Sequence, residues 1–216
     1  MKTKIPKASK QIFSLLLFLS FSWHVLGQGT LQITFDGPPV QPPGTAYTVT
    51  NYYESGMSFR PLAGSYGFGR VGASPVSFRP DNGSAYLQAT LAPAETLRFS
   101  FTNNSVFNLN SVDLAEYSTV VPNAVTVHFV GYRHDGSIVT TDFTTDGIID
   151  GTGPLADFQT FYFGKQFTDL DRVEIPTYGW SLDNLVVSIP EPATGALLLV
   201  GGLVFGALKS RANRLG

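Results

Sequence analysis

The middle of the chain, residues 28–189, contains no stretch in which apolar residues recur every three or four positions. It consists of short runs rich in Val, Thr, Phe and Tyr, separated by Gly, Asn, Asp and Pro. Such runs favour strands, because β-branched and aromatic side chains pack well on a pleated surface and the intervening residues form tight turns. We therefore predict an all-β fold, an antiparallel sandwich or barrel.

About ten strands are expected at fairly regular spacing. Their ranges are 31–35, 47–53, 85–91, 96–102, 107–117, 124–133, 138–143, 158–163, 171–175 and 182–189. His134-Asp135-Gly136-Ser137 and Asn82-Gly83 predict hairpin-type turns. Residues 54–80 are rich in Gly, Ser, Pro and Arg, so we expect an irregular excursion over one end of the sandwich.

Residues 28–189 carry seven Arg and Lys against fifteen Asp and Glu, a net charge of −8, whereas the whole chain carries −2. An acidic body disfavours nucleic acid and anionic surfaces as partners. The chain has no Cys, so disulfides and thiolate chemistry are excluded and an apolar core must hold the fold. The length of this segment fits one domain.

The C-terminal segment, residues 190–216, has the composition of a membrane-directed tag. It contains Pro190-Glu191-Pro192, an uncharged apolar run at 193–208, and then Lys209, Arg211 and Arg214. As a helix the run would extend about 24 Å, which just spans a thinned bilayer. The basic end favours a cytoplasmic C-terminus and leaves residues 28–189 on the other side. A buried core helix is the alternative, but a run with four glycines and no polar face makes a poor amphipathic helix.

The N-terminal segment, residues 1–27, has the pattern of a signal peptide. Four lysines precede an apolar run at 12–21, and small or apolar residues lead to Gly27. Signal peptidase is expected to cleave between Gly27 and Gln28. A transmembrane anchor is the alternative, but this apolar run is too short to span a bilayer.

Pro190-Glu191-Pro192, followed by the apolar run and the basic end, resembles the PEP-CTERM sorting signal of Gram-negative, biofilm-forming bacteria. The resemblance implies transient anchoring in the inner membrane and cleavage near the Pro-Glu-Pro motif by exosortase, a membrane protease. It also implies release to the outer envelope or the extracellular matrix. It covers only the C-terminal tail and says nothing about the folded body.

The body begins with Ile33-Thr34-Phe35-Asp36 and ends with Trp180-Ser181-Leu182-Asp183-Asn184-Leu185-Val186-Val187. This last run resembles the closing strand of jelly-roll domains in carbohydrate-binding modules. In such modules the first and last strands are neighbours and often share a structural Ca²⁺ ion. The resemblance therefore implies a jelly-roll-like sandwich with Ca²⁺ between Asp36 and Asp183. The alternative is that Asp183 accepts hydrogen bonds from loop amides.

Two glycine-rich motifs have simpler interpretations. Residues 67–72 have the glycine spacing of a dinucleotide-binding fingerprint, but no strand leads into them and Pro75 follows, so we expect a flexible loop with Phe68 packed against the body. Residues 146–153 contain two Asp-Gly pairs that fit either oxygen ligands for Ca²⁺ or two tight turns, and turn chemistry favours the turns.

No hydrolase motif is present, and residues 28–189 contain only His128 and His134, so catalysis is not expected. Polysaccharide contact is the expected role, because aromatic rings stack on the C–H faces of sugars. The candidate rings are Tyr52, Tyr53, Tyr66 and Trp180. Two alternatives stay open, a structural matrix protein without a ligand and a cryptic glycoside hydrolase or lyase.

Overall fold

The computed structural model describes residues 29–73, 76, 78–90, 95–121, 123–148 and 158–190. Thr30–Pro190 form one compact unit. The leader, its cleavage site, the apolar run 193–208 and most of the sorting motif lie outside the described residues, as do Lys209, Arg211 and Arg214. Within the described ranges, no helix is long and apolar enough to cross a membrane.

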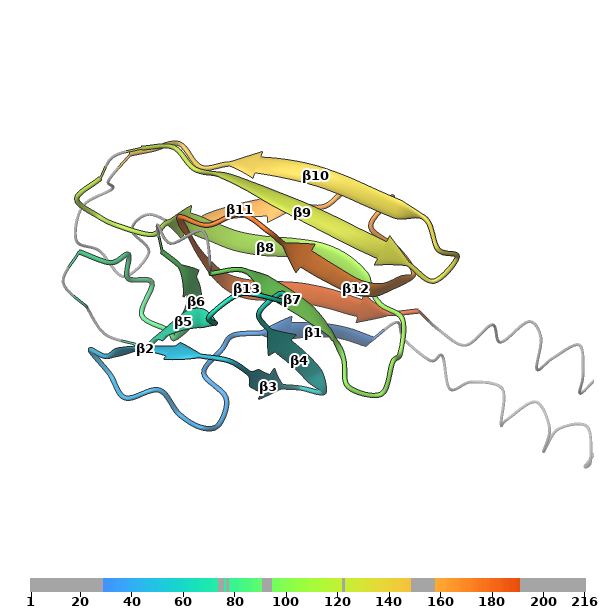
Figure 1. Cartoon of the computed structure of the whole chain (residues 1–216), viewed down its shortest axis with the longest axis horizontal. Coiled ribbons are helices and arrows are strands. Elements are labelled where there is room, and N and C mark those ends of the chain that lie inside the picture. The colour runs from blue at the N-terminus through green and yellow to red at the C-terminus, as the bar shows by residue number, and fades with distance from the viewer. Residues whose placement is uncertain are drawn as a thin grey trace, which may run out of the picture. The chain divides into compact units, whose positions relative to one another are not determined.

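The described residues form two antiparallel sheets that pack as a sandwich, so the all-β prediction is confirmed (Figure 1). The first sheet has the order β11 (Gln159–Tyr162), β8 (Asn108–Glu116), β13 (Trp180–Ile189), β6 (Tyr86–Ala89), β5 (Phe68–Val71) and β2 (Ala46–Val49), with β1 (Gly29–Ile33) also paired to β13. The second has the order β10 (Ile138–Thr144), β9 (Thr126–Arg133), β12 (Leu170–Ile175), β7 (Leu97–Phe101), β4 (Met57–Arg60) and β3 (Tyr52–Glu54).

The core lies between the two sheets and is rich in Phe. Alternate residues of each strand point inward, as in Leu97, Phe99 and Phe101 of β7, which are buried while the residues between them are partly exposed. Neighbouring rings meet at angles, for example Phe35 and Phe59 with ring centroids 5.2 Å apart. Edge-to-face packing of this kind adds to simple burial and helps a chain without disulfides.

The last strand, β13, lies inside the first sheet and serves three neighbours. Trp180–Leu182 pair with β6, and the whole strand runs beside β8, where the register shifts between Asp183 and Val186. Asn184 has a positive φ of 47° at this bulge. Beyond the shift β13 has β1 as its neighbour, and the Gln32 side chain donates to Asn184 Oδ1 at 2.7 Å. The first and last strands are therefore adjacent, as the jelly-roll resemblance implied.

The expected hairpin at residues 134–137 is confirmed. Arg133 N donates to Ser137 O at 2.9 Å and Gly136, with φ 84°, turns the chain between β9 and β10. The expected hairpin turn at Asn82-Gly83 is wrong, because the bend falls at Gly83, with φ 80°, and Ser84, near the end of the long connection between β5 and β6.

The expected irregular excursion over residues 54–80 is wrong, because this segment contributes β4 and β5 to the two sheets. The flexible-loop interpretation of residues 67–72 is wrong for the same reason, since all four residues of β5 are buried between β6 and β2. Phe68 does pack in the core. Gly67 is required by close approach, because a Cβ there would collide with the backbone oxygen of Val49. The expected strand 47–53 is in fact split into β2 and β3, which belong to different sheets.

A buried arginine in β5 anchors the chain between β1 and β2. Arg70 is 2% exposed, its guanidinium lies 4.2 Å from the centroid of the Tyr52 ring, and it donates to backbone oxygens of Phe35, Gly37 and Pro39. Tyr52 in turn donates to Glu54, at 2.8 Å. A charge this deeply buried is tolerated because several acceptors surround it.

Candidate functional site

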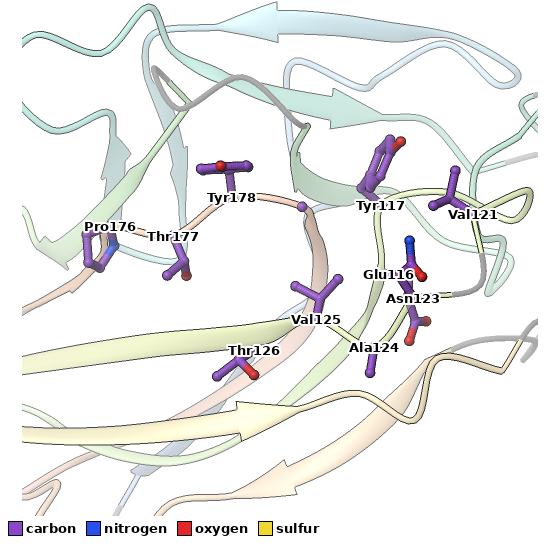
Figure 2. A pocket seen from close by; sticks show the side chains of 11 residues that line it. Glu116, Tyr117, Val121, Asn123, Ala124, Val125, Thr126, Pro176, Thr177 and Tyr178 are labelled. Atoms are coloured by element: carbon purple, nitrogen blue, oxygen red, sulfur yellow. The ribbon is translucent and has the colours of Figure 1, made fainter.

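A pocket of about 460 Å³ opens between two connections of the sandwich, β8–β9 and β12–β13 (Figure 2). Figure 2 shows the rings of Tyr178 and Tyr117 at the upper left and upper right of the view, with Val125, Ala124 and Thr126 below them. Its lining consists of Glu116, Tyr117, Val121, Asn123, Ala124, Val125, Thr126, Pro176, Thr177, Tyr178 and Gly179. Its volume is within the range of small-molecule sites.

Backbone and side-chain hydrogen bonds fix the two connections to the sheets. Tyr117 N donates to Gly179 O at 3.0 Å, which ties the end of β8 to the start of β13. Gly179, at φ 87°, donates to the oxygens of Ala89 and Thr90. The buried Trp180 indole donates to Thr177 O at 2.8 Å. These hydrogen bonds therefore hold the pocket wall in a fixed position against the core.

The pocket combines aromatic rings with neutral polar groups. Tyr178 is 42% exposed, and Asn123 and Thr126 of the same lining are also exposed. Glu116 is the one carboxylate among the described residues that line the pocket, and it is buried, with Oε1 accepting a hydrogen bond from Gly147 N at 2.8 Å. A neutral ligand with apolar faces and hydroxyl edges fits these groups.

The four predicted stacking residues have different positions. Tyr53 and Tyr66 are 45% and 78% exposed and can present a ring to a ligand. Tyr52 and Trp180 are 3% and 0% exposed, so the prediction is wrong for these two: their rings pack in the core. None of the four lines the pocket.

Neither Tyr117 nor Tyr178 stands out in the sequence as a candidate ligand-binding residue. Tyr117 ends the predicted strand 107–117, and Tyr178 lies between the predicted strands 171–175 and 182–189. Only the fold brings these two rings to one pocket, because they lie far apart in sequence.

Asp36 and Asp183 both bind the segment that precedes β6. Asp183 is fully buried, and its Oδ2 accepts hydrogen bonds from Asn82 Nδ2 and Ser84 Oγ, each at 2.5 Å. Asn184 N donates to Oδ1 at 2.7 Å, and Asp36 Oδ1 accepts from Ala85 N at 2.9 Å. Burial raises the pKa of Asp183 from 3.8 to about 7; the hydrogen bonds from Ser84, Asn82 and Asn184 oppose this rise, and the charge of Asp36 adds to it.

These contacts fit a carboxyl group held by hydrogen-bond donors better than a calcium site. Both oxygens of Asp183 already accept hydrogen bonds, and among the described residues no three acidic or histidine side chains gather where they could hold a metal. Calcium at this place stays a prediction of the sequence. In the second candidate calcium segment, Ile148 N donates to Asp146 Oδ1 at 2.8 Å, an Asx turn; residues 149–153 lie outside the described residues.

No protein-family model matches the chain. No curated protein matches it either. Among solved structures, the chain is similar to a family 11 carbohydrate-binding module from Clostridium thermocellum, in complex with a β-1,3-1,4-mixed-linked tetrasaccharide. The identity is 11%, the match covers 78% of this chain and 91% of that one, and the TM-score is 0.27.

Proposed function

We propose that this chain is an exported cell-surface or extracellular-matrix protein whose β-sandwich binds polysaccharide without cleaving it. The observation that carries the proposal is the pocket whose lining combines Tyr117 and Tyr178 with exposed amide and hydroxyl groups. A pyranose ring has apolar C–H faces and a rim of hydroxyl groups, so it stacks on tyrosine and hydrogen-bonds to Asn and Thr. The absence of an exposed charge in the described lining favours a neutral sugar.

Binding is favoured over hydrolysis because glycosidases generally use two carboxyl groups that flank the scissile bond. The described lining offers only Glu116, which is 5% exposed. His128 and His134 pair with Asp142 and Asp171 on the surface and do not line the pocket. A structural matrix protein without a ligand is the competing function.

The export part of the proposal depends on the two end segments. Residues 1–27 fit a leader for signal peptidase, and 190–216 fit a tag for an exosortase-like protease. The compact unit ends at Pro190, directly after β13, so a cut just beyond it would leave the sandwich whole. This supports release into the outer envelope or the extracellular space.

Mass spectrometry of the protein from its own host tests export. The expected mature species begins at Gln28 and lacks Lys209–Gly216, and Glu191→Ala is expected to leave uncleaved precursor in the membrane. An intact C-terminus in the exported wild-type protein would exclude the sorting mechanism.

Binding to neutral polysaccharides tests the pocket. In pull-downs with insoluble glucans and titrations with soluble ones, Tyr178→Ala is expected to weaken binding about tenfold, the effect of losing roughly 1.4 kcal/mol of stacking. Tyr162→Ala is the matched control, because Tyr162 is 76% exposed on β11 and does not line the pocket. Absence of binding to every glucan would favour the structural role, and release of reducing ends would favour a hydrolase.

A further inference from the structure

The outer face of the second sheet carries two arginines directly opposite each other. Arg60 on β4 pairs in register with Arg98 on β7. Their neighbours Phe59, Leu97 and Phe99 are buried in the core, so alternation along each strand turns both arginines outward. β4 and β7 are adjacent strands in Figure 1.

This arrangement is unfavourable in the free protein. Like charges directly opposite each other on neighbouring strands repel, and neighbouring strands are only about 4.8 Å apart. Residues 28–189 contain just seven cationic side chains in a body with a net charge of −8. Two of these seven cations therefore lie face to face on neighbouring strands, where they repel each other, although cations are few in the body as a whole.

The carboxylate opposite Arg98 is already engaged by other side chains. Glu174 on β12 lies opposite Arg98. Its two oxygens, however, accept hydrogen bonds from Arg172 Nε at 3.1 Å and Tyr132 Oη at 2.9 Å. Arg172 also stacks on the Tyr132 ring, 3.6 Å from its centroid, so this group is held in place.

Both arginines keep donors available. Among the described residues, the side chain of Arg98 has no hydrogen bond or ion pair, and Arg60 donates only to Tyr53 Oη, at 2.9 Å. Tyr53, 45% exposed, lies beside this pair on β3, and its ring faces the Arg60 guanidinium at 5.9 Å. Two guanidinium groups with free donors are suited to grip a carboxylate.

We propose that Arg60 and Arg98 bind the carboxylate of an anionic, uronic-acid-containing polysaccharide, with Tyr53 stacking on the adjoining sugar ring. The bound carboxylate would neutralise the opposed charges, which make this face a local exception to the acidic body that otherwise disfavours anionic partners. An exposed aromatic ring next to the pair favours a sugar over an acidic peptide, because the ring matches the flat apolar face of a pyranose. This site shares no lining residue with the pocket of Tyr117 and Tyr178, and rests on the proposed function only in taking a glycan as the ligand.

The test measures binding of the full-length protein, in mild detergent, to polygalacturonate and to its fully methyl-esterified form. The two polymers share one backbone and differ in charge. We expect polygalacturonate to bind at least tenfold more tightly, and this preference to shrink at high salt because the interaction is electrostatic. Equal binding of the two polymers, or no binding of polygalacturonate, would overturn the proposal.

Arg98→Gln and Arg60→Gln are each expected to weaken polygalacturonate binding at least tenfold, while Lys165→Gln, which removes a cation outside this face, leaves it unchanged. Neither arginine variant should melt at a lower temperature, since each removes a repulsion. Equal loss in the Lys165 variant, or equally tight binding of poly-glutamate, would refute a specific uronate site. Tyr178→Ala should spare polygalacturonate binding and Arg98→Gln should spare neutral glucan binding, so the two sites fail separately.

Discussion

The buried carboxyl group of Asp183 is expected to make the stability of the sandwich depend on pH. The ordinary pKa of an aspartate is 3.8. In the folded protein the pKa of Asp183 is raised to about 7, because burial disfavours the charged form. The folded state therefore binds the proton more tightly than the unfolded state. The stabilisation is complete below about pH 4 and is lost as the pH rises towards and through 7.

The size of the effect follows from the two pKa values. A tenfold difference in proton affinity corresponds to about 1.4 kcal/mol, so ionisation of Asp183 in place costs up to about 4 kcal/mol. The hydrogen-bond partners of Asp183 can accommodate both its neutral and its ionised form. When neutral, Asp183 can donate to Ser84 Oγ, 2.5 Å away, and the Ser84 hydroxyl donates to Asn82 Oδ1 at 2.9 Å.

Asp183→Asn tests this reasoning because it keeps the shape and removes the titration. Urea unfolding of both proteins between pH 4 and 9 gives the difference in the free energy of unfolding at each pH. We expect the variant to gain on the wild type by up to about 4 kcal/mol between pH 4 and 8, and no further gain above. The other titrating groups are the same in both proteins, so their contributions cancel when the two free energies of unfolding are subtracted.

Asp113→Asn is the matched control, because Asp113 is a partly exposed carboxylate on β8 that accepts hydrogen bonds from Thr160 and Asn184. A difference between wild type and Asp183→Asn that stays flat with pH would refute the reasoning. So would a wild type that gains on the variant as the pH rises, because Asp183 would then be ionised and stabilised in the fold.

Three further predictions concern stability. Gly72→Ala should lower the free energy of unfolding by about 1–3 kcal/mol, because the new Cβ collides with the backbone oxygen of Pro42, whereas Gly29→Ala, with open space around its Cβ, should be neutral in the same urea experiment. Melting curves with Ca²⁺ and with chelator should coincide, since donors occupy Asp183; a calcium shift of several degrees that disappears in Asp183→Asn would restore the calcium site. Arg70→Met should cost about 2–4 kcal/mol by leaving carbonyls of residues 35–39 without a donor, and a melting temperature equal to that of wild type would show that water replaces the guanidinium.

The features that the sequence predicts correctly are those with local causes. The strands β9 and β10 are long and alternate, and their turn contains Asp-Gly, so neighbouring residues alone define the hairpin. Trp180 shows the limit of such local patterns. It alternates with Ser181 and Asp183, yet all three are buried because β13 lies inside the sheet, so the prediction of Trp180 as a stacking residue was wrong.

The features that it fails to predict depend on distant partners. β4 and β5 are each four residues long and are flanked by Gly, Ser and Pro, so only pairing with β7, β6 and β2 makes them strands. In the sequence Arg70 looks like an ordinary exposed arginine, and only the fold brings the carbonyl groups of residues 35–39 around its guanidinium. The pocket of Tyr117 and Tyr178 likewise requires two connections that meet only in the folded sandwich.

The internal position of β13 has a consequence for the order in which the molecule can form. Residues Trp180–Ile189 are the last of the described strands to be synthesised, yet β8, β6 and β1 all need them as a partner. A nascent chain that stops short of this strand exposes unpaired backbone along β8 and β6, which invites pairing with other chains. The two halves of the larger sheet are joined only when these ten residues are available, so we expect the sheet to be completed late, through contacts between the two ends of the body.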